Sequence, residues 1–183
     1  GDPVWAAANS LASAEIYDPL SGSWSPVGSM STGRKSYSLS LLANGRVLAA
    51  GGQTGAVNLS SAELYDPASG TWLTTGFMPG LREGHAAVRL ADGRVLAAGG
   101  NNAGALSGVV LYDPSVGTWS SAAPLNSARS NHSALALPSG KVMVIGGTTG
   151  AGVGISTTEL YDPASGVWTF ANILNAGRYN TPA

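Results

Sequence analysis

Short apolar runs alternate with turn-forming residues along nearly the whole chain of 183 residues. The runs Val47-Leu-Ala-Ala50 and Val142-Met-Val-Ile145 are continuously apolar, which is typical of strands that are covered on both faces. Each run ends at a glycine pair, which permits positive φ and a close approach by a large neighbouring ring. The pattern predicts short β-strands and no helix longer than one turn.

A tight turn precedes each of these apolar runs. Asn44-Gly45, Asp92-Gly93 and Ser139-Gly140 each separate two apolar segments, and such dipeptides indicate a two-residue hairpin loop with both residues at positive φ. The sequence therefore predicts an antiparallel hairpin in each unit. Its first strand covers residues 36–42, 85–90 and 132–137, and its second strand covers residues 46–50, 94–98 and 141–145.

A second hairpin is marked by a tyrosine that is followed seven residues later by a tryptophan. An Asp-Pro step after the tyrosine and a glycine two residues before the tryptophan favour a tight turn between two strands. Successive tyrosines are 48, 47 and 49 residues apart, a period that indicates an array of similar supersecondary units. We expect both rings to fill the space between neighbouring sheets. The pairs are Tyr17/Trp24, Tyr65/Trp72, Tyr112/Trp119 and Tyr161/Trp168.

Arginine and glycine positions repeat together with the aromatic residues. An arginine stands ten residues after each tryptophan, and a glycine pair stands seventeen residues after each of the first three arginines. Only the step from the glycine pair to the next tyrosine varies in length, so the units differ mainly in the loops 53–59, 101–106 and 148–156. The arginines are Arg34, Arg82, Arg129 and Arg178, and the glycine pairs are Gly51-Gly52, Gly99-Gly100 and Gly146-Gly147.

The glycine pair, the tyrosine and the tryptophan seven residues later, in a period near 50, resemble the Kelch repeat of bacterial type. The resemblance implies an all-β Kelch-type β-propeller of about four blades, each with four antiparallel strands, in a galactose-oxidase-like arrangement. Residues 1–183 are then one propeller region. Its blades cover residues 1–30 (second to fourth strands only), 34–78, 82–125 and 129–174, and a further first strand starts at 178–183.

The two ends of the chain suggest a blade that is split or shared. Residues 4–9 resemble a degenerate second strand, and residues 178–183 resemble the start of a first strand. We expect a segment of a larger propeller, or else a two-chain ring in which self-association completes the propeller. A closed ring of four blades is the least favoured arrangement, because two large rings in each blade resist such crowding.

Composition excludes several classes of function. Charged residues make up 10% of the chain and the formal net charge is −1, which argues against nucleic acid and polybasic membrane surfaces as partners. No apolar run is long enough to span a membrane. The absence of cysteine excludes the tyrosine–cysteine crosslink of copper radical oxidases, and nothing indicates a cofactor or a metal. Few lysines and many small polar residues suggest a secreted or cell-surface protein.

The candidate binding residues fall at one end of the predicted propeller. An up-and-down topology places both tight hairpins of each blade at one end, and the variable loops and the arginines at the other. We weigh a partner-binding role, in which arginines donate to carboxylates, against a structural role, which a residue present in every unit more often has. The candidates are Arg34, Arg82, Glu83, Asn101, Asn102, Arg129, Asn131, Thr148, Thr149 and Arg178.

Two further sets of ionisable residues are more simply interpreted as hydrogen-bonding residues than as a metal site or a catalytic pair. His85 and His132 stand three residues after an arginine, where hydrogen bonding is a better reading than a metal site, because a metal site needs a third ligand. Glu15, Glu63 and Glu159 stand two residues before a tyrosine and favour hydrogen bonding at a strand edge over catalysis. No catalytic residue is assigned.

The sequence therefore predicts a module that binds a protein or a ligand and has no evident catalytic machinery. A carbohydrate-active or metal-dependent propeller enzyme is one alternative, and a structural, self-assembling surface protein is another. The expected partner is a protein or a glycan.

Overall fold

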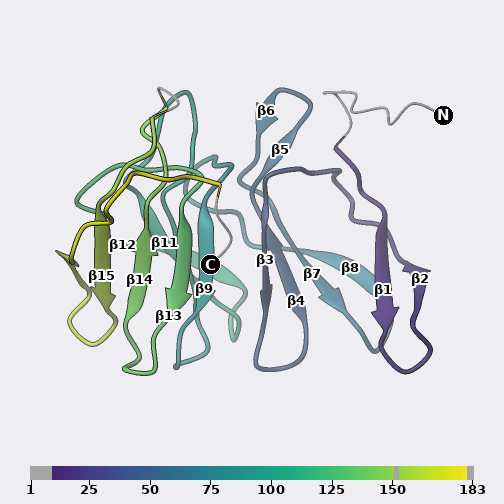
Figure 1. Cartoon of the computed structure of the whole chain (residues 1–183). Helices are drawn as coiled ribbons and strands as arrows, with labels where there is room; N and C mark the ends of the chain where they lie inside the picture. Colours follow the sequence, from purple (N-terminus) through teal and green to yellow (C-terminus); the bar gives the residue numbers. More distant parts are fainter. Residues whose placement is uncertain (1–9, 151–152, 181–183) are drawn as a thin grey trace.

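The computed structural model describes residues 10–150 and 153–180, in which all regular structure is β (Figure 1). Three four-stranded antiparallel sheets and a two-stranded sheet form what we call blades 1 to 4 in chain order. Blade 1 contains β1 (Ala14–Asp18) and β2 (Ser23–Val27). Blade 2 contains β3 (Ser38–Leu41), β4 (Val47–Ala50), β7 (Ala62–Asp66) and β8 (Thr71–Thr75). Blade 3 contains β9 (Ala86–Arg89), β10 (Val95–Ala98), β11 (Val109–Asp113) and β12 (Thr118–Ala122). Blade 4 contains β13 (Ser133–Ala136), β14 (Val142–Ile145), β15 (Thr158–Asp162) and β16 (Val167–Phe170).

Each four-stranded blade is an up-and-down meander, and the first strands of these blades are neighbours in space. β3, β9 and β13 therefore line a common axis, while β8, β12 and β16 lie on the outside. The arrangement confirms the predicted all-β propeller architecture. Within the described ranges, no helix is long and apolar enough to cross a membrane.

The apolar core lies between neighbouring blades. On β10, Val95 and Ala97 belong to a cluster shared with blade 2, whereas Leu96 and Ala98 belong to a cluster shared with blade 4. All four residues are fully buried. This confirms the interpretation of the continuously apolar run as a strand that is covered on both faces.

The tyrosine and tryptophan of each repeat stand directly opposite each other on the last two strands of a blade. Their ring centroids are 4.9 to 5.2 Å apart and their planes are tilted by 37° to 49° in the four copies. Residues directly opposite in an antiparallel pair are close enough for such ring contacts. The strand register therefore explains why the pair has nearly the same geometry in every blade.

The burial of the four tryptophans differs, although the repeat predicts the same packing for all of them. Trp168 is buried and its Nε1 donates to the carbonyl of Ala123 in the link after blade 3 (3.0 Å). Trp72 and Trp119 are half-buried, and the buried Nε1 of each has no hydrogen-bond partner in the described part of the chain. Each tryptophan stands on the outermost strand of its blade, so its burial depends on how the preceding blade and its link cover it. The expectation of a buried ring in every blade is therefore wrong for Trp24, which is exposed, and correct only in part for Trp72 and Trp119.

The first hairpin of blades 2, 3 and 4 has a three-residue turn, and the predicted two-residue turn is wrong. In blade 2, the N–H of Gly45 donates to the carbonyl of Leu42 (3.1 Å), and the N–H of Leu42 donates to the carbonyl of Arg46 (2.8 Å). Gly45 has a φ of 82°, whereas Asn44 is not at positive φ and accepts from the N–H of Arg46 (3.1 Å). A type I turn that ends in a left-handed glycine needs only that one positive φ.

Each first strand begins one or two residues later than predicted, because the chain kinks before it. The residue two positions after each arginine has positive φ: Ser36 (52°), Gly84 (56°), Asn131 (53°) and Asn180 (54°). These residues link successive blades around the axis. The N–H of Gly84 donates to the carbonyl of Ser36 (2.9 Å), that of Asn131 to Gly84 (2.8 Å), and that of Asn180 to Asn131 (2.9 Å).

The glycine pairs make a second set of contacts between blades. The N–H of Gly100 donates to the carbonyl of Arg129 in the next blade (2.9 Å), and the other two pairs make the equivalent bond. Gly99 has a φ of 63°, and a Cβ there would collide with the carbonyl of Arg129 and lie 2.9 Å from Cε1 of His132. The ring that approaches Gly99 is thus an imidazole. The atom closest to an added Cβ, however, is the backbone oxygen of Arg129.

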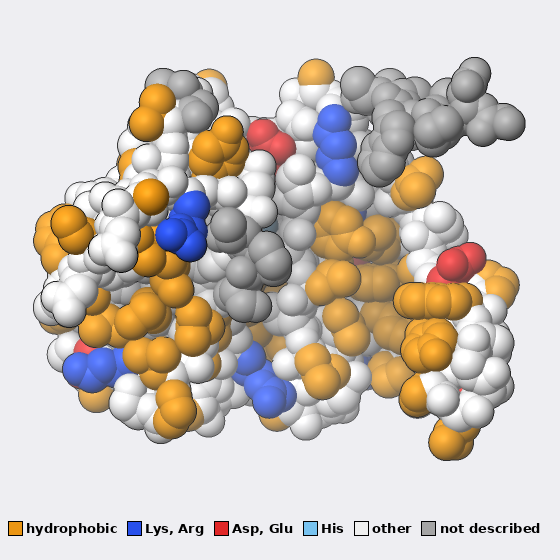
Figure 2. Space-filling model, in the orientation of Figure 1, with side chains coloured by type: hydrophobic (Ala, Val, Ile, Leu, Met, Phe, Trp, Pro, Cys, Tyr) orange, Lys and Arg blue, Asp and Glu red, His pale blue; other side chains and the backbone are white. Residues whose placement is uncertain are grey.

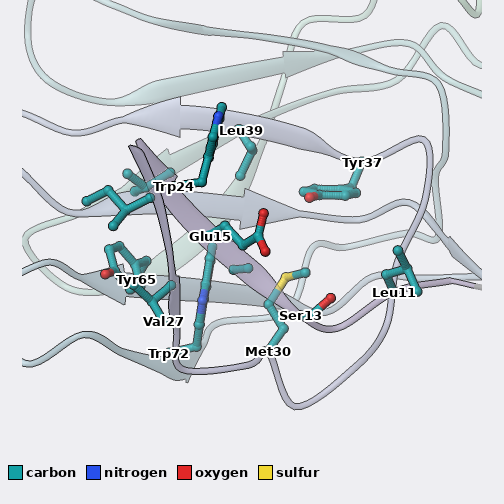
Figure 3. A pocket seen from close by; sticks show the side chains of 13 residues that line it. Leu11, Ser13, Glu15, Trp24, Val27, Met30, Tyr37, Leu39, Tyr65 and Trp72 are labelled. Carbon is teal, nitrogen blue, oxygen red and sulfur yellow. The ribbon is translucent and has the colours of Figure 1, made fainter. Parts of the chain in front are cut away.

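A groove of about 690 Å³ separates blade 1 from blade 2 (Figure 3). Figure 2 shows hydrophobic side chains gathered in this hollow, between β1 and the strands β3 and β4. Its lining includes Trp24 of β2, Leu39 of β3, and Tyr65 and Trp72 of the last two strands of blade 2. β7 pairs with both β4 and β8, whereas the equivalent β1 pairs with β2 alone among the described residues. The predicted second strand at residues 4–9 lies outside these residues.

Candidate functional site

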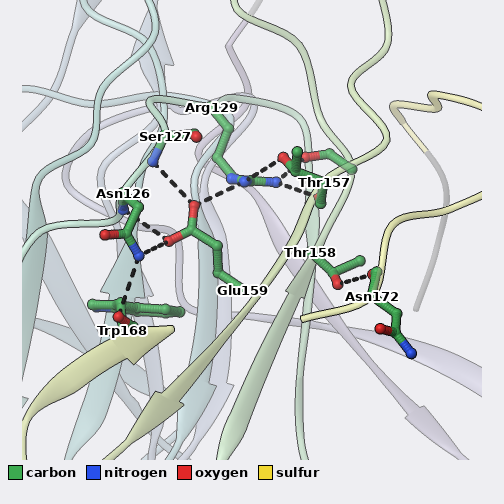
Figure 4. A network of polar contacts seen from close by, with 9 residues as sticks. Asn126, Ser127, Arg129, Thr157, Thr158, Glu159, Trp168 and Asn172 are labelled. Atoms are coloured by element: carbon green, nitrogen blue, oxygen red, sulfur yellow. Dashed lines mark hydrogen bonds and ion pairs between the residues drawn. The ribbon is translucent and has the colours of Figure 1, made fainter. Parts of the chain in front are cut away.

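Three of the repeated arginines, Arg34, Arg82 and Arg129, are buried and bind groups of their own blade. Figure 4 shows this for Arg129. Nη1 of Arg129 donates to the carbonyls of Gly146 (2.7 Å) and Thr157 (2.9 Å). Nη2 donates to Oγ1 of Thr157 and to Oε1 of Glu159, both at 2.9 Å. The side chains of Arg129 and Glu159 are both 0% exposed. This arginine is therefore part of the internal structure of blade 4.

The carboxylate of Glu159 ties the preceding link to the blade. It accepts from the backbone N–H of Asn126 (2.8 Å) and Ser127 (3.1 Å), and from Nδ2 of Asn126 (2.9 Å). Asn126 and Ser127 are thus both bound to Glu159, which fixes the segment that enters blade 4. A charged acceptor with several donors is stable when buried, because its lost hydration is replaced.

Blade 2 repeats this network with Arg34 and Glu63, whose Nη2 and Oε1 atoms are 2.7 Å apart. The N–H groups of Ser31 (2.7 Å) and Thr32 (3.3 Å) donate to the same carboxylate. Burial raises the pKa of Glu63, but the hydrogen bonds from Ser31 and Arg34 outweigh it and hold the pKa below its usual value. Glu63 is thus an ionised structural group at neutral pH.

Blade 3 lacks the carboxylate. Val110 stands where the other two complete blades have a glutamate, yet Nη1 of Arg82 still donates to the carbonyls of Gly99 (3.0 Å) and Gly108 (2.9 Å). Pro79 stands where those blades have the first N–H donor to the carboxylate. Because proline has no N–H, the first N–H donor and its acceptor are lost together in blade 3.

Each of these arginines closes the base of one variable loop. The carbonyls of Gly146 and Thr157, which Arg129 binds, stand at the two ends of the loop in blade 4. Arg34 binds the equivalent carbonyls of Gly51 (2.8 Å) and Ser61 (3.1 Å). One guanidinium thus fixes the start and the end of a loop whose interior differs from blade to blade.

The three loops begin alike and then diverge. The residue after each arginine forms a β-bridge with the residue after each glycine pair: Lys35 with Gln53, Glu83 with Asn101, and Ser130 with Thr148. Beyond that bridge the loop of blade 2 forms a small hairpin of β5 (Gln53–Thr54) and β6 (Val57–Asn58). The other loops fold back through the bridges Asn101–Ala105 and Thr148–Gly154. The three loops therefore start from the same backbone bridge but differ in fold and in side chains from blade to blade.

A cavity of about 220 Å³ lies at this end of the axis, where the first strands begin, and we call it the axial cup. Its lining comes from the second and third residues after the arginines, so it is built from two adjacent positions of the repeat. No lining residue carries a fixed charge. The lining residues are Ser36, Tyr37, Gly84, His85, Asn131, His132 and Asn180.

The two histidines of the cup are buried and neutral. His85 is 7% exposed and His132 is 8% exposed. Burial, together with the charges of Arg82 and Arg129 respectively, lowers the pKa of each histidine to about 3. Nε2 of His85 lies 2.9 Å from Oγ of Ser38, a hydrogen bond of the expected kind. Residues 10–150 and 153–180 contain no group of three His, Cys, Asp or Glu side chains that could hold a metal ion.

The repeat units of this chain match the Kelch motif over residues 5–31, 34–74, 84–126 and 128–175. The chain belongs to the Kelch-repeat family. No curated protein sequence matches this Kelch-repeat chain significantly. A solved structure described as "Structure of YjhT" matches it with a TM-score of 0.74 at 15% sequence identity, over 86% of this chain. The Kelch-repeat chain spans 58% of the length of that structure, and at this identity the likeness concerns the fold alone.

The predicted binding residues of this Kelch-repeat protein separate into two groups. Arg34, Arg82 and Arg129 are at most 4% exposed and are bonded within their own blades, so we leave them out of the binding surface proposed below. The remaining candidates lie at the loop-bearing end with different exposure. Asn102, Asn131, Thr149 and Arg178 are exposed, Glu83 and Asn101 are half-buried, and Thr148 is buried.

Sequence reasoning missed part of the axial cup. Ser36 and Asn180 share the column of Asn131 and line the cup with it, but only Asn131 was among the predicted residues. The spacing from each arginine could have identified this column. Neither the positive φ nor the approach of these residues to the axis is visible in the sequence, because both depend on how the blades pack.

Proposed function

We propose that this Kelch-repeat region is a binding module that holds a protein or glycan partner at its loop-bearing end. The observation that carries the proposal is the contrast at this end between buried, repeated arginines and exposed loop residues that differ between blades. Val57, Asn102 and Thr149 are exposed residues of the three loops, one from each. A rigid scaffold that presents variable loops is a common basis for recognition.

The arginine networks support this proposal through preorganisation. Each guanidinium fixes both ends of one loop before a partner arrives, and Asn58 joins two loops through its Nδ2, which donates to the carbonyl of Asn101 (3.0 Å). Loops that are already ordered lose less conformational entropy on binding. The loops are therefore suited to contact a partner without refolding.

Loop exchange tests this function. Wild-type protein is screened on glycan and peptide arrays, and the ligands found are measured again with residues 101–106 replaced by a Gly/Ser loop. A matched control changes Asn44 and Ser69 in the tight turns at the other end. We expect binding to be lost in the loop variant and kept in the control, with similar melting temperatures. Binding that survives loop exchange and is lost in the control would place the partner at the hairpin end.

A further inference from the structure

The contact between blades 3 and 4 joins two different kinds of face. On blade 3, Val88, Leu96 and Leu111 stand side by side on three strands and are at most 9% exposed. They belong to one core cluster with Tyr161 and Trp168 of blade 4. We call the face with the apolar row the aliphatic face of a blade, and the face with the tyrosine–tryptophan pair its aromatic face. Inside the chain, an aliphatic face thus packs on the aromatic face of the next blade.

One face of each kind is left open at the two ends of the array of blades. The aliphatic face of blade 4 carries the equivalent row of Leu135, Met143 and Leu160, which are only half-buried. Figure 2 shows hydrophobic side chains gathered over β13 and β14. The aromatic face of blade 1 carries Tyr17 and Trp24, which are exposed. The two blades lie on opposite sides of the molecule, as the positions of β1 and β15 show (Figure 1).

The polar network that joins successive blades is divided between the same two ends. In blade 4, Glu159 binds Arg129 and an asparagine three residues before that arginine. The link after blade 4 has Asn175 and Arg178 at the equivalent positions, and blade 1 has Glu15 at the position of the glutamate. All three are exposed, and their side chains make no hydrogen bond to another described residue. The acceptor of the network is thus at one end of the chain and its donors are at the other.

We propose that a second copy of this chain docks head to tail, with the aromatic face of blade 1 in one copy on the aliphatic face of blade 4 in the other. Trp24 then packs against the row that contains Met143, and Glu15 accepts from Arg178 of the other copy. The opposed surfaces reproduce a contact that the chain already forms internally, and the opposite charges fall at matching positions. Both observations favour a second copy over an unrelated partner. The contact is heterologous, so docking on one face leaves the other face of each copy available.

Two variants that each block one face test the proposal. Sedimentation velocity should show monomers of the wild-type chain at about 1 µM and assemblies at about 500 µM, because association follows mass action. Trp24→Glu blocks the aromatic face and Met143→Glu blocks the aliphatic face, so each variant alone should stay monomeric. An equimolar mixture of the two should form a dimer and nothing larger, because it contains only one pair of intact complementary faces.

The polar network is tested separately. Glu15→Gln and Arg178→Gln should each weaken association about tenfold, since each leaves one charge at the contact without its partner. The double variant should associate no more weakly than either single variant. The matched control is Val116→Glu, which changes an exposed apolar residue in a hairpin turn of blade 3 and should associate as wild type does. Melting temperatures at low concentration check that every variant is folded.

Four results would overturn the proposal: a wild-type chain that stays monomeric at about 500 µM, a monomeric mixture of the two blocked variants, self-association of either blocked variant, or loss of association in Val116→Glu. The proposed function is judged independently, because the contact uses no residue of the loop 101–106. The loop-exchange variant should therefore associate as wild type does. If it loses array ligands while the wild-type chain stays monomeric, only this inference fails and the proposed function stands.

Discussion

Blade 1 and blade 4 carry the same tyrosine–tryptophan hairpin in different surroundings. The ring centroids of Tyr17 and Trp24 are 5.2 Å apart, and those of Tyr161 and Trp168 are 4.9 Å apart. The exposed fractions are very different: Tyr17 and Trp24 are 47% and 65% exposed, whereas Tyr161 and Trp168 are 4% and 6% exposed. The geometry of the pair is therefore set by its own hairpin, whereas its burial depends on the neighbouring blade.

The difference lies in what surrounds each hairpin. Tyr161 and Trp168 belong to a core cluster with blade 3, and Nε1 of Trp168 donates to the carbonyl of Ala123. Trp119 of blade 3 is intermediate, since it packs against the cluster shared with blade 2 but is only half-buried. Among the described residues, no blade precedes blade 1, and β1 has one strand partner instead of two. As in other repeat proteins, stability then comes from the interfaces between units as well as from each unit.

The largest expected effect separates the two tryptophans. Trp168→Ala should lower the free energy of unfolding by about 4 kcal/mol, because it leaves a large cavity in the core between two blades. Trp24→Ala should cost about 1 kcal/mol or less, since its ring is mostly exposed. Urea denaturation measures both. Similar losses in the two variants would show that the groove beside blade 1 is filled in solution.

The glutamates sharpen the same comparison. Glu159→Gln leaves the buried charge of Arg129 without its carboxylate and should cost about 3 kcal/mol in urea denaturation. Glu15 is the equivalent residue of blade 1 and is exposed. Glu15→Gln should change the stability by about 0.5 kcal/mol or less. A large loss in Glu15→Gln would mean that blade 1 contains its own buried network.

Acid should weaken blades 3 and 4 through their histidines, whereas blade 1 has none in the described residues. The pKa of His85 and His132 is about 3 in the folded protein and 6.5 when unperturbed. The unfolded chain therefore binds more protons below pH 6.5, and stability that is complete above that pH decreases as the pH falls towards 3. The slope reaches about 1.4 kcal/mol per pH unit for each histidine.

Urea denaturation between pH 6.5 and 5 measures this slope, since the shifted carboxylates titrate only at lower pH. The double variant His85→Gln/His132→Gln should flatten the pH dependence in this range, even if it lowers the stability at pH 7. A slope that does not change would show that the two imidazoles are accessible to protons in the folded protein.

The repeat made the architecture predictable, because period, turn residues and apolar runs are local properties of a sequence. The contacts between blades were not predictable in the same way. Ser36 and Asn131 take positive φ because they bond around the axis, and no turn motif marks them. The sequence shows that Val110 replaces the glutamate in blade 3. Only the structure shows that Pro79 stands at the place of an N–H donor to that glutamate, so that donor and acceptor are both absent.

The candidate site shows the same limit. The repeated arginines could be located from their spacing. Their binding to both ends of one loop was not predictable, because it depends on how the ends of neighbouring strands are placed in the folded blade. His85 lies 2.9 Å from Oγ of Ser38 in the neighbouring blade, whereas both ring nitrogens of His132 lack a partner in the described residues, and Ala86 stands at the position equivalent to Ser38. Such pairs can be recognised only after the blades are placed side by side.

The most direct test of this account is the accessibility of the individual tryptophans, measured by hydroxyl-radical footprinting with mass spectrometry at low protein concentration. Trp24 is 65% exposed and Trp168 is 6% exposed, a ratio of about ten. The account predicts that Trp24 is oxidised roughly ten times faster than Trp168, as expected if reactivity follows exposed side-chain area. Equal protection of the two rings would contradict it, because the hairpin of blade 1 would then be buried like that of blade 4.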